Sequence, residues 1–223
     1  MGGVLTAVSE SLKDQYRDST NLQARIDLHA RFSTATRDFH AWVFDQYDLP
    51  ASARVLEIGC GTGLLWEKNR KRIPTTWRLT LTDFSVGMVT TARQTLTAQN
   101  LSARYVHNDA QALPFLSDSF DALIANHMLF HVPDIPRAIA EIRRVLTRGG
   151  KLYAATNGRG HLQELFDIAG RFLGKPIAHD GMRFKREDGG AMLAAELRDV
   201  RRIDYPDELV VTEVEPLMAF ILV

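Results

Sequence analysis

The residues of this chain most clearly arranged for chemistry are one acid and three glycines at alternate positions. Glu57 stands within an apolar run, and Gly59, Gly61 and Gly63 follow it in the pattern G-x-G-x-G. Glycines at such a turn let the backbone bend sharply and let a ligand approach without meeting a Cβ. A helix beginning at Leu64 would direct its unpaired N–H groups into the same space. The pattern therefore predicts a nucleotide-binding turn.

The spacing of these glycines bears on which nucleotide is bound. A dinucleotide-binding turn has the pattern G-x-G-x-x-G, whose third glycine would fall one residue after Gly63. Glu57 would oppose a pyrophosphate, but it can hold an ammonium group directly or through water. We therefore expect a ligand that is cationic at this point, with an NAD(P)-binding oxidoreductase as the alternative.

Two further carboxylates follow later strands. Asp83 ends an expected strand over 77–82, where a carboxylate can chelate both ribose hydroxyls, although NAD-binding proteins place an acid there too. Asp109, with Ala110 beside it, follows an expected strand over 103–107 and can accept the exocyclic amine of adenine; an ordinary surface loop is the other interpretation. Ligands of open parallel sheets bind beyond the carboxyl ends of the strands, so these acids are expected at one site.

The elements that must position these residues alternate along the chain. Expected strands cover 54–58, 77–82, 103–107, 120–125 and 151–155, and expected helices cover 64–72, 85–99 and 134–148. This alternation predicts an α/β fold, a doubly wound, mostly parallel Rossmann-like sheet with helices on both faces. Residues 1–50 show helical spacing without strand signals, so we divide the chain into an N-terminal helical segment, 1–50, and a ligand-binding domain, 51–223.

The run Val-Leu-Glu-Ile-Gly-Cys-Gly-Thr-Gly resembles the first motif of class I S-adenosylmethionine (SAM) methyltransferases. Segments 113–115, 118–121 and 144–152 resemble later motifs in the same order, so the resemblance covers about 54–156. It is most similar to the type-11 branch, which includes ubiquinone and menaquinone biosynthetic methyltransferases. The resemblance implies SAM as cofactor and methyl transfer to a small-molecule acceptor by in-line displacement. A methyltransferase-like protein that binds SAM or S-adenosylhomocysteine (SAH) without catalysis is the alternative.

Carried over by position, the resemblance distributes the candidate residues along the cofactor. It implies methionine-end contacts from Glu57, Gly59, Gly61 and Gly63, ribose contacts from Asp83 and Phe84, adenine contacts from Asp109 and Ala110, and sulfonium-end contacts from Asn126 and His127. His127 and His131 are the candidate bases, which are needed only if the acceptor must lose a proton. A structural or substrate-binding role is the other interpretation of both. No cluster has the spacing of a metal site.

The N-terminal segment has two interpretations. Its aromatic and aliphatic residues are those of helices that pack against the domain. The resemblance adds a second role, since methyltransferases of this class often close their site with N-terminal helices. Tyr16, Arg25 and His29 are then the polar residues expected to face the ligand.

The amino-acid composition limits the kinds of molecule that this chain is expected to bind. Lysine plus arginine equals aspartate plus glutamate at 27 each, so no overall field draws the chain to nucleic acid or an anionic membrane. The single cysteine, Cys60, excludes an internal disulfide and fits a reducing cytoplasm. The first residues lack the pattern of a signal peptide, and the longest apolar run, 218–223, is too short to span a bilayer. We expect a cytoplasmic enzyme with a small-molecule substrate.

The last fifty residues give the weakest signals. Residues 200–205 are predicted as a sixth strand, and the family's sheet adds a seventh, antiparallel strand between the fifth and sixth. Glu215-Pro216 favours a helix start instead, so we expect the domain to be incomplete at this end, with a shortened chain or a homodimer that covers the gap. The rival expectation is that 218–223 forms the seventh strand. No residue indicates which acceptor is methylated, or whether on O, N or C.

Overall fold

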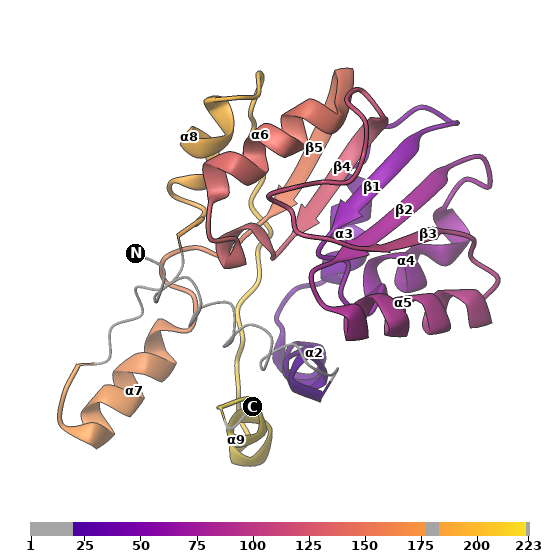
Figure 1. The fold of residues 1–223 in the computed structure, drawn as a ribbon. Helices are drawn as coiled ribbons and strands as arrows, with labels where there is room; N and C mark the ends of the chain where they lie inside the picture. Colours follow the sequence, from indigo (N-terminus) through magenta and orange to yellow (C-terminus); the bar gives the residue numbers. More distant parts are fainter. Residues whose placement is uncertain (1–19, 177–182, 222–223) are drawn as a thin grey trace.

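The computed structural model describes residues 20–176 and 183–221, and its centre is a five-stranded sheet (Figure 1). The strands are β1 (Arg54–Ile58), β2 (Arg78–Asp83), β3 (Arg104–His107), β4 (Phe120–Asn126) and β5 (Leu146–Ala155). Neighbours pair in parallel in the order β3-β2-β1-β4-β5, so the direction of winding reverses between β1 and β4. This arrangement confirms the predicted doubly wound α/β fold and sets its switch point beside the glycine turn.

Helices cover both faces of the sheet. One face carries α3 (Phe39–Asp45), α4 (Leu64–Asn69), the 3₁₀ turn η1 (Arg70–Arg72) and α5 (Val86–Ala98); the other carries α6 (Ile135–Val145) and α8 (Gly189–Ala194). Alternate strand residues supply the two cores. Val55 faces Trp66 and Leu96 on the first side, and Leu56 faces Ile139 on the second.

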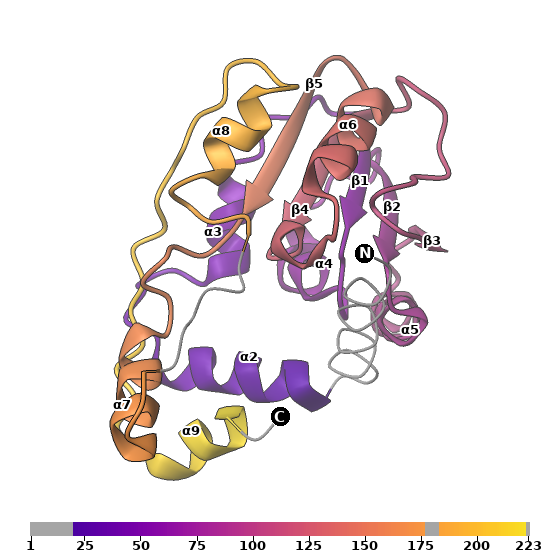
Figure 2. The same cartoon turned by 60° about the vertical axis from the view of Figure 1, so that its left-hand side comes forward.

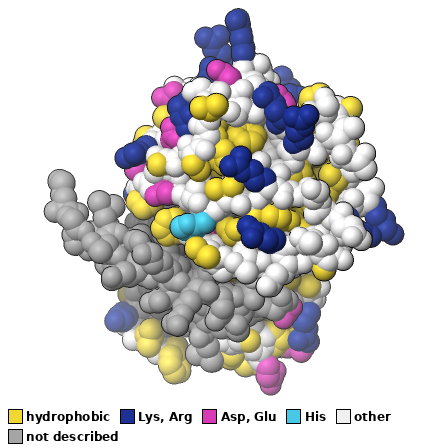
Figure 3. Space-filling model, turned by 45° about the vertical axis from the view of Figure 1, so that its right-hand side comes forward, with side chains coloured by type: hydrophobic (Ala, Val, Ile, Leu, Met, Phe, Trp, Pro, Cys, Tyr) yellow, Lys and Arg dark blue, Asp and Glu magenta, His cyan; other side chains and the backbone are white. Residues whose placement is uncertain are grey.

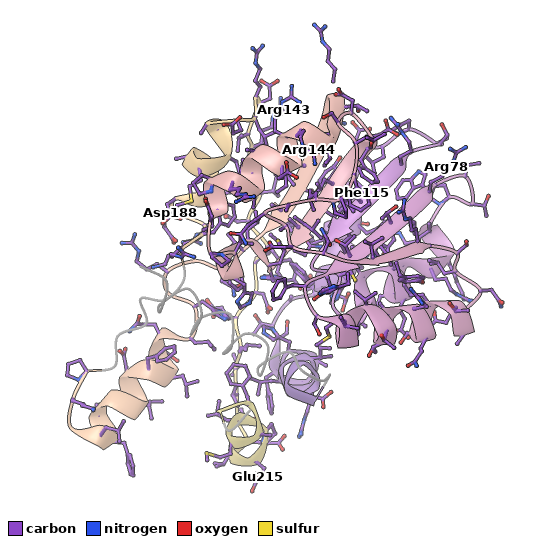
Figure 4. All side chains as sticks on the ribbon, viewed as in Figure 1. Arg78, Phe115, Arg143, Arg144, Asp188 and Glu215 are labelled. Carbon is purple, nitrogen blue, oxygen red and sulfur yellow. The ribbon has the colours of Figure 1, made fainter. Side chains whose placement is uncertain are left out.

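Local sequence features determine where most of the helices and strands begin and end. The Ser85 hydroxyl accepts the Met88 N–H and starts α5, as its place before an apolar run predicts. Helix α6 ends earlier than expected, because the chain passes directly into β5 at Leu146, which pairs with Phe120 before a register shift. Arg144 ties α6 to the loop before β4 by donating to the carbonyl of Phe115 at 2.7 Å (Figure 4).

Three helices lie beyond the carboxyl ends of the strands: α2 (Thr20–Phe32), α7 (Gln163–Leu173) and α9 (Val214–Ile221) (Figure 2). Helix α9 packs on α2, and the chain leading into it is joined to the end of α2 by a hydrogen bond from Val210 N to Phe32 O at 2.9 Å. None of the helices that the structure describes is both long and apolar enough to cross a lipid bilayer.

The predicted sixth strand at 200–205 is wrong. This stretch pairs with no strand within the described ranges, and Ile203 is 61% exposed. Its polar groups are used locally: Arg202 pairs with Asp204 at 3.3 Å, and the Tyr205 hydroxyl donates to Arg37 O at 2.6 Å. Because the side chains do not alternate between a buried and an exposed face, the stretch gains little from sheet pairing. Residues 214–221 form a helix, as Glu215-Pro216 favours, rather than a seventh strand.

Candidate functional site

A cavity of about 2220 Å³ lies at the carboxyl ends of the strands, and most of the sequence-predicted site residues line it. The lining includes Glu57, Gly59, Gly61, Asp83, Phe84, Asp109, Ala110, Asn126, His127 and His131, and also His29 from α2. Gly63 does not line the cavity; it faces α5, where an added Cβ would lie 2.9 Å from Leu96 Cδ1. Arg25 lies in α2, and Tyr16 lies outside the described residues.

The glycine turn has the left-handed backbone that its sequence predicts. Gly59, Gly61 and Gly63 have φ values of +69°, +53° and +83°. At Gly59 an added Cβ would lie 2.7 Å from the Cβ of Met128, so the turn and the loop after β4 approach closely. Gly61 N donates to the Asp83 carboxylate at 2.9 Å, which joins the turn to the end of β2. Both the left-handed backbone conformation and the lack of room beside Met128 therefore require a glycine at position 59.

Glu57 is buried, with only 3% of its surface exposed. Its pKa is raised to about 8, chiefly by burial; a hydrogen bond from the Trp66 indole opposes the rise, and the charge of Asp83 adds to it. Without a ligand, the carboxyl is therefore mostly protonated at neutral pH. A cation placed against it would favour the ionised form, since opposite charges lower the pKa of an acid. Glu57 is thus a buried acid suited to a positively charged ligand.

Asp83 holds the turn and faces the cavity. Its carboxylate accepts N–H groups from Gly61 at 2.9 Å and Ser85 at 2.8 Å. Burial raises the pKa of Asp83, and these backbone hydrogen bonds oppose the rise. The next residue, Phe84, is 46% exposed and lies beside the His107 ring at 6.3 Å between centroids. A carboxylate and an aromatic ring therefore stand together at the end of β2.

Asp109 already has partners within its own loop. Its carboxylate accepts the Gln111 N–H at 2.8 Å and the Gln111 side-chain amide at 2.9 Å on both oxygens. These bonds are those of a local turn. Asp109 and the buried Ala110 nevertheless line the cavity, so the acid combines a structural contact with access to a ligand.

His127 follows β4 in a left-handed conformation, with φ of +51°, and its N–H donates to Ala155 O at 2.9 Å. Its ring lies against Phe39 of α3 at 4.9 Å between centroids. Burial, followed by the charges of His161, His40, His29 and His131, lowers the pKa of His127 to about 4. His131 belongs to the 3₁₀ turn η2 (Leu129–His131) and lines the same cavity. The imidazole of His127 is therefore neutral at neutral pH.

Two residues of this site were not identified from the sequence. The Trp66 indole donates to Glu57 Oε2 at 2.5 Å. Tyr47 lines the cavity beside Glu57. Among the described residues, its buried hydroxyl and the buried Asn126 Nδ2 have no hydrogen-bond partner of ordinary geometry. Burial, followed by the charge of Glu57, raises the pKa of Tyr47, and the Asn126 amide partly offsets the rise. Both aromatics have the spacing of core residues, so no sequence signal separates them from their neighbours.

His29 joins α2 to the C-terminal segment at the far side of the cavity. Its Nδ1 lies 3.9 Å from the carboxylate of Asp207, which also accepts the Ser33 hydroxyl at 2.6 Å. Burial lowers the pKa of His29, and Asp207 opposes the change. Within residues 20–176 and 183–221, no group of His, Cys, Asp or Glu side chains is arranged to hold a metal ion.

Comparisons with known proteins match this chain to methyltransferases. Residues 56–154 match a methyltransferase domain family, type 11. A ubiquinone/menaquinone biosynthesis C-methyltransferase of Dinoroseobacter shibae is 38% identical over 104 residues, and a malonyl-[acyl-carrier protein] O-methyltransferase of Erwinia pyrifoliae is 37% identical over 112. These alignments cover 46% and 50% of this chain and 41% and 40% of the relatives, so the chain spans about two fifths of their length.

The fold also matches solved structures. A SAM-dependent methyltransferase of Thermotoga maritima aligns with a TM-score of 0.58 and 20% identity, over 82% of this chain and 78% of that one. At this identity the match concerns the fold. The family match covers most of the segment in which the motifs were recognised, and it confirms that recognition.

Proposed function

We propose that this chain, whose residues 56–154 form a class I SAM-dependent methyltransferase domain of the type-11 branch, transfers a methyl group to a small-molecule acceptor. The cofactor of this class of domain is SAM, which supplies a methyl group on a positively charged sulfur. The observation that carries the proposal is the buried acid Glu57, which stands against a glycine turn at the switch point of the sheet.

The residues around the turn fit this cofactor. Glu57 offers a carboxylate to the ammonium group of the methionine end, and Gly59 lines the same cavity without a side chain. Tyr47 and Asn126 present a buried hydroxyl and a buried amide nitrogen for which the described residues supply no hydrogen-bond partner of ordinary geometry. Buried polar groups are normally satisfied, so such a pair suits a polar ligand. Asp83 would then accept the ribose hydroxyls, and Asp109 the adenine amine.

The chain's own contribution to the transfer is chiefly alignment. A sulfonium methyl is already activated, so holding the acceptor in line and close supplies much of the acceleration. His127 and His131 would stand at the methyl end. The pKa of His127 is lowered to about 4, so its ring is neutral but only a weak base, and it suits a hydrogen bond to the acceptor better than removal of a proton from it.

The acceptor is proposed to occupy the part of the cavity away from the turn. At about 2220 Å³ the cavity exceeds the roughly 300–1,000 Å³ of an ordinary ligand pocket, so it has room for a second molecule. Apolar residues from three helices, Ile26, Leu165 and Phe220, line this part. On the face seen in Figure 3, lysines and arginines are interspersed with apolar and acidic side chains, and the net charge is zero. A small molecule therefore suits the site better than nucleic acid.

The direct test is a search for methylated product. The protein would be incubated with a metabolite library and SAM carrying a deuterated methyl group, and products would be detected by mass spectrometry as a mass gain of the labelled methyl. A labelled small molecule supports the proposal. Binding of SAH without any labelled product would favour a cofactor-binding protein without catalysis. A strong, salt-sensitive gel shift with tRNA would instead point to a nucleic-acid acceptor.

The cofactor assignment predicts the effect of changing Asp83. Calorimetry should detect binding of SAH but not of NADH, and Asp83→Ala should weaken SAH binding by about 1–3 kcal/mol because the ribose hydroxyls lose a charged partner. Asp121→Ala is the matched control, since Asp121 pairs with Arg54 at the opposite end of the sheet, at 2.8 Å, and should leave SAH affinity unchanged. Tight NADH binding with no response to SAH would contradict the assignment.

A further inference from the structure

One buried side chain outside the recognised motif holds the central acid of the site. Trp66 lies in the first turn of α4, immediately after the glycine turn, and has no exposed surface. Its indole N–H donates to Glu57 Oε2 at 2.5 Å. Trp66 packs in the same core as Leu81 and Ile124, so its ring is held on all sides.

The groups around Glu57 make the hydrogen bond from Trp66 important for the charge state of this carboxyl. Among the described residues, the Asp83 carboxyl, the Tyr47 hydroxyl and the Cys60 thiol interact electrostatically with its carboxyl. None of these is a cation, and burial, followed by the charge of Glu57, raises the pKa of both Tyr47 and Cys60. Within the part of the chain that the structure describes, Trp66 is the one hydrogen-bond donor to this carboxylate.

We propose that Trp66 is a positioning residue of the cofactor site, whose indole N–H orients the Glu57 carboxylate and sustains the ionised form that receives a ligand's ammonium group. The inference rests on the proposed function, because it assumes that Glu57 binds the ammonium of SAM. With Oε2 occupied by the indole, Oε1 remains for the ligand. Trp66 itself touches no reacting atom.

The proposal has a pH signature that a purely structural role lacks. Since burial raises the pKa of Glu57 to about 8, SAH should bind more tightly as pH rises through this value. Without the indole N–H, the pKa of Glu57 should rise further, because a hydrogen bond to a carboxylate favours its charged form. The SAH affinities of the wild type and of a variant without the indole N–H should therefore differ at pH values below the pKa of Glu57 in either protein. Above both pKa values the two affinities should be equal.

The experiment measures the SAH dissociation constant by calorimetry from pH 6 to 9.5 for the wild type, Trp66→Phe and Trp77→Phe. Trp66→Phe should bind about tenfold more weakly at pH 7, with its binding midpoint about one pH unit higher, since one unit of pKa is a tenfold change in ionised fraction. Trp77→Phe is the control, because that indole donates to Pro50 O at 3.0 Å near the protein surface. The amino group of SAH also titrates in this pH range, but it does so equally in the measurements on all three proteins.

The outcomes separate the two hypotheses. A wild type that does not bind SAH would refute the proposed function. A wild type that binds SAH, with a Trp66→Phe variant that matches it or is weaker by one constant factor at every pH, would refute the role of Trp66. If Trp66→Phe does not fold, the indole ¹⁵N–¹H resonances of the wild type decide. The Trp66 signal should shift with a midpoint near that of Glu57 while the Trp77 signal does not, and a Trp66 signal that ignores pH would overturn the inference.

Discussion

Glu57→Gln is expected to weaken SAH binding by about 2–3 kcal/mol, roughly 30- to 150-fold, because the ammonium group loses its charged partner in a buried place. The substitution keeps the shape of the side chain, and its carbonyl oxygen can still accept the Trp66 indole N–H. Calorimetry at pH 8.5, where the wild-type carboxyl is largely ionised, gives the largest contrast. An unchanged affinity would show that Glu57 does not contact the ligand's cation.

The same change should stabilise the folded protein at alkaline pH. The folded state holds the proton of Glu57 up to a pKa of about 8, whereas the unfolded state loses it near 4.5. Between these values the folded state binds more protons, so the contribution of Glu57 to stability is full below 4.5 and is lost as pH rises through 8. At about 1.4 kcal/mol per pKa unit, the loss is on the order of 5 kcal/mol. Glutamine does not titrate, so the Glu57→Gln variant does not undergo this loss of stability.

Urea unfolding at pH 5 and pH 9 measures this difference. The wild type should lose more stability than Glu57→Gln between the two values. Glu141→Gln is the control of opposite sign, because the Arg144 ion pair holds the pKa of Glu141 below its ordinary value. That pair contributes stability above pH 4.5 and loses it on acidification, so its removal should destabilise the protein at both pH 5 and pH 9 and leave SAH binding unchanged. A wild type and Glu57→Gln that respond equally to pH would contradict the pKa argument.

The parts of the fold that follow local rules could be predicted from the sequence. Five strands alternate with capped helices, and the carboxylates Glu57, Asp83 and Asp109 follow successive strands. A parallel sheet brings such strand ends together whatever the loops do, so their meeting at one cavity could be foreseen. The conformation of the glycine turn follows in the same way from Gly59, Gly61 and Gly63.

What could not be predicted depends on contacts between distant segments. The indole of Trp66 points to Glu57 rather than only into the core because α4 starts directly behind β1, which the apolar spacing of α4 does not encode. Residues 200–205 have enough β-branched and aromatic content for a strand, but hydrogen bonds to the region after α2 compete for that segment. The role of Gln111 as a partner of Asp109 likewise depends on side-chain rotamers.

Gly59→Ala is expected to destabilise the protein by about 2–5 kcal/mol, because two costs add. Holding an L-residue at φ of +69° costs about 1–2 kcal/mol. The new methyl would also lie 2.7 Å from the Cβ and 2.9 Å from the Cγ of Met128, and overpacking of this kind costs about 1–3 kcal/mol. The Cβ of Met128 cannot move away by rotating the side chain, so the backbone after β4 must shift.

Gly149→Ala carries the first cost, the backbone penalty, without the second. Gly149 has φ of +79°, but an added Cβ there meets nothing within 4 Å. It should therefore show only the backbone penalty, and the difference in unfolding free energy between the two variants, about 1–3 kcal/mol, measures the close approach of the turn to Met128. Because Met128 follows Asn126 and His127, the shift in Gly59→Ala should also weaken SAH binding, whereas Gly149→Ala should not. Equal destabilisation by the two alanine substitutions, with SAH affinity unchanged in both, would contradict this argument. It would mean that the glycine turn and the loop after β4 can move apart at no energetic cost.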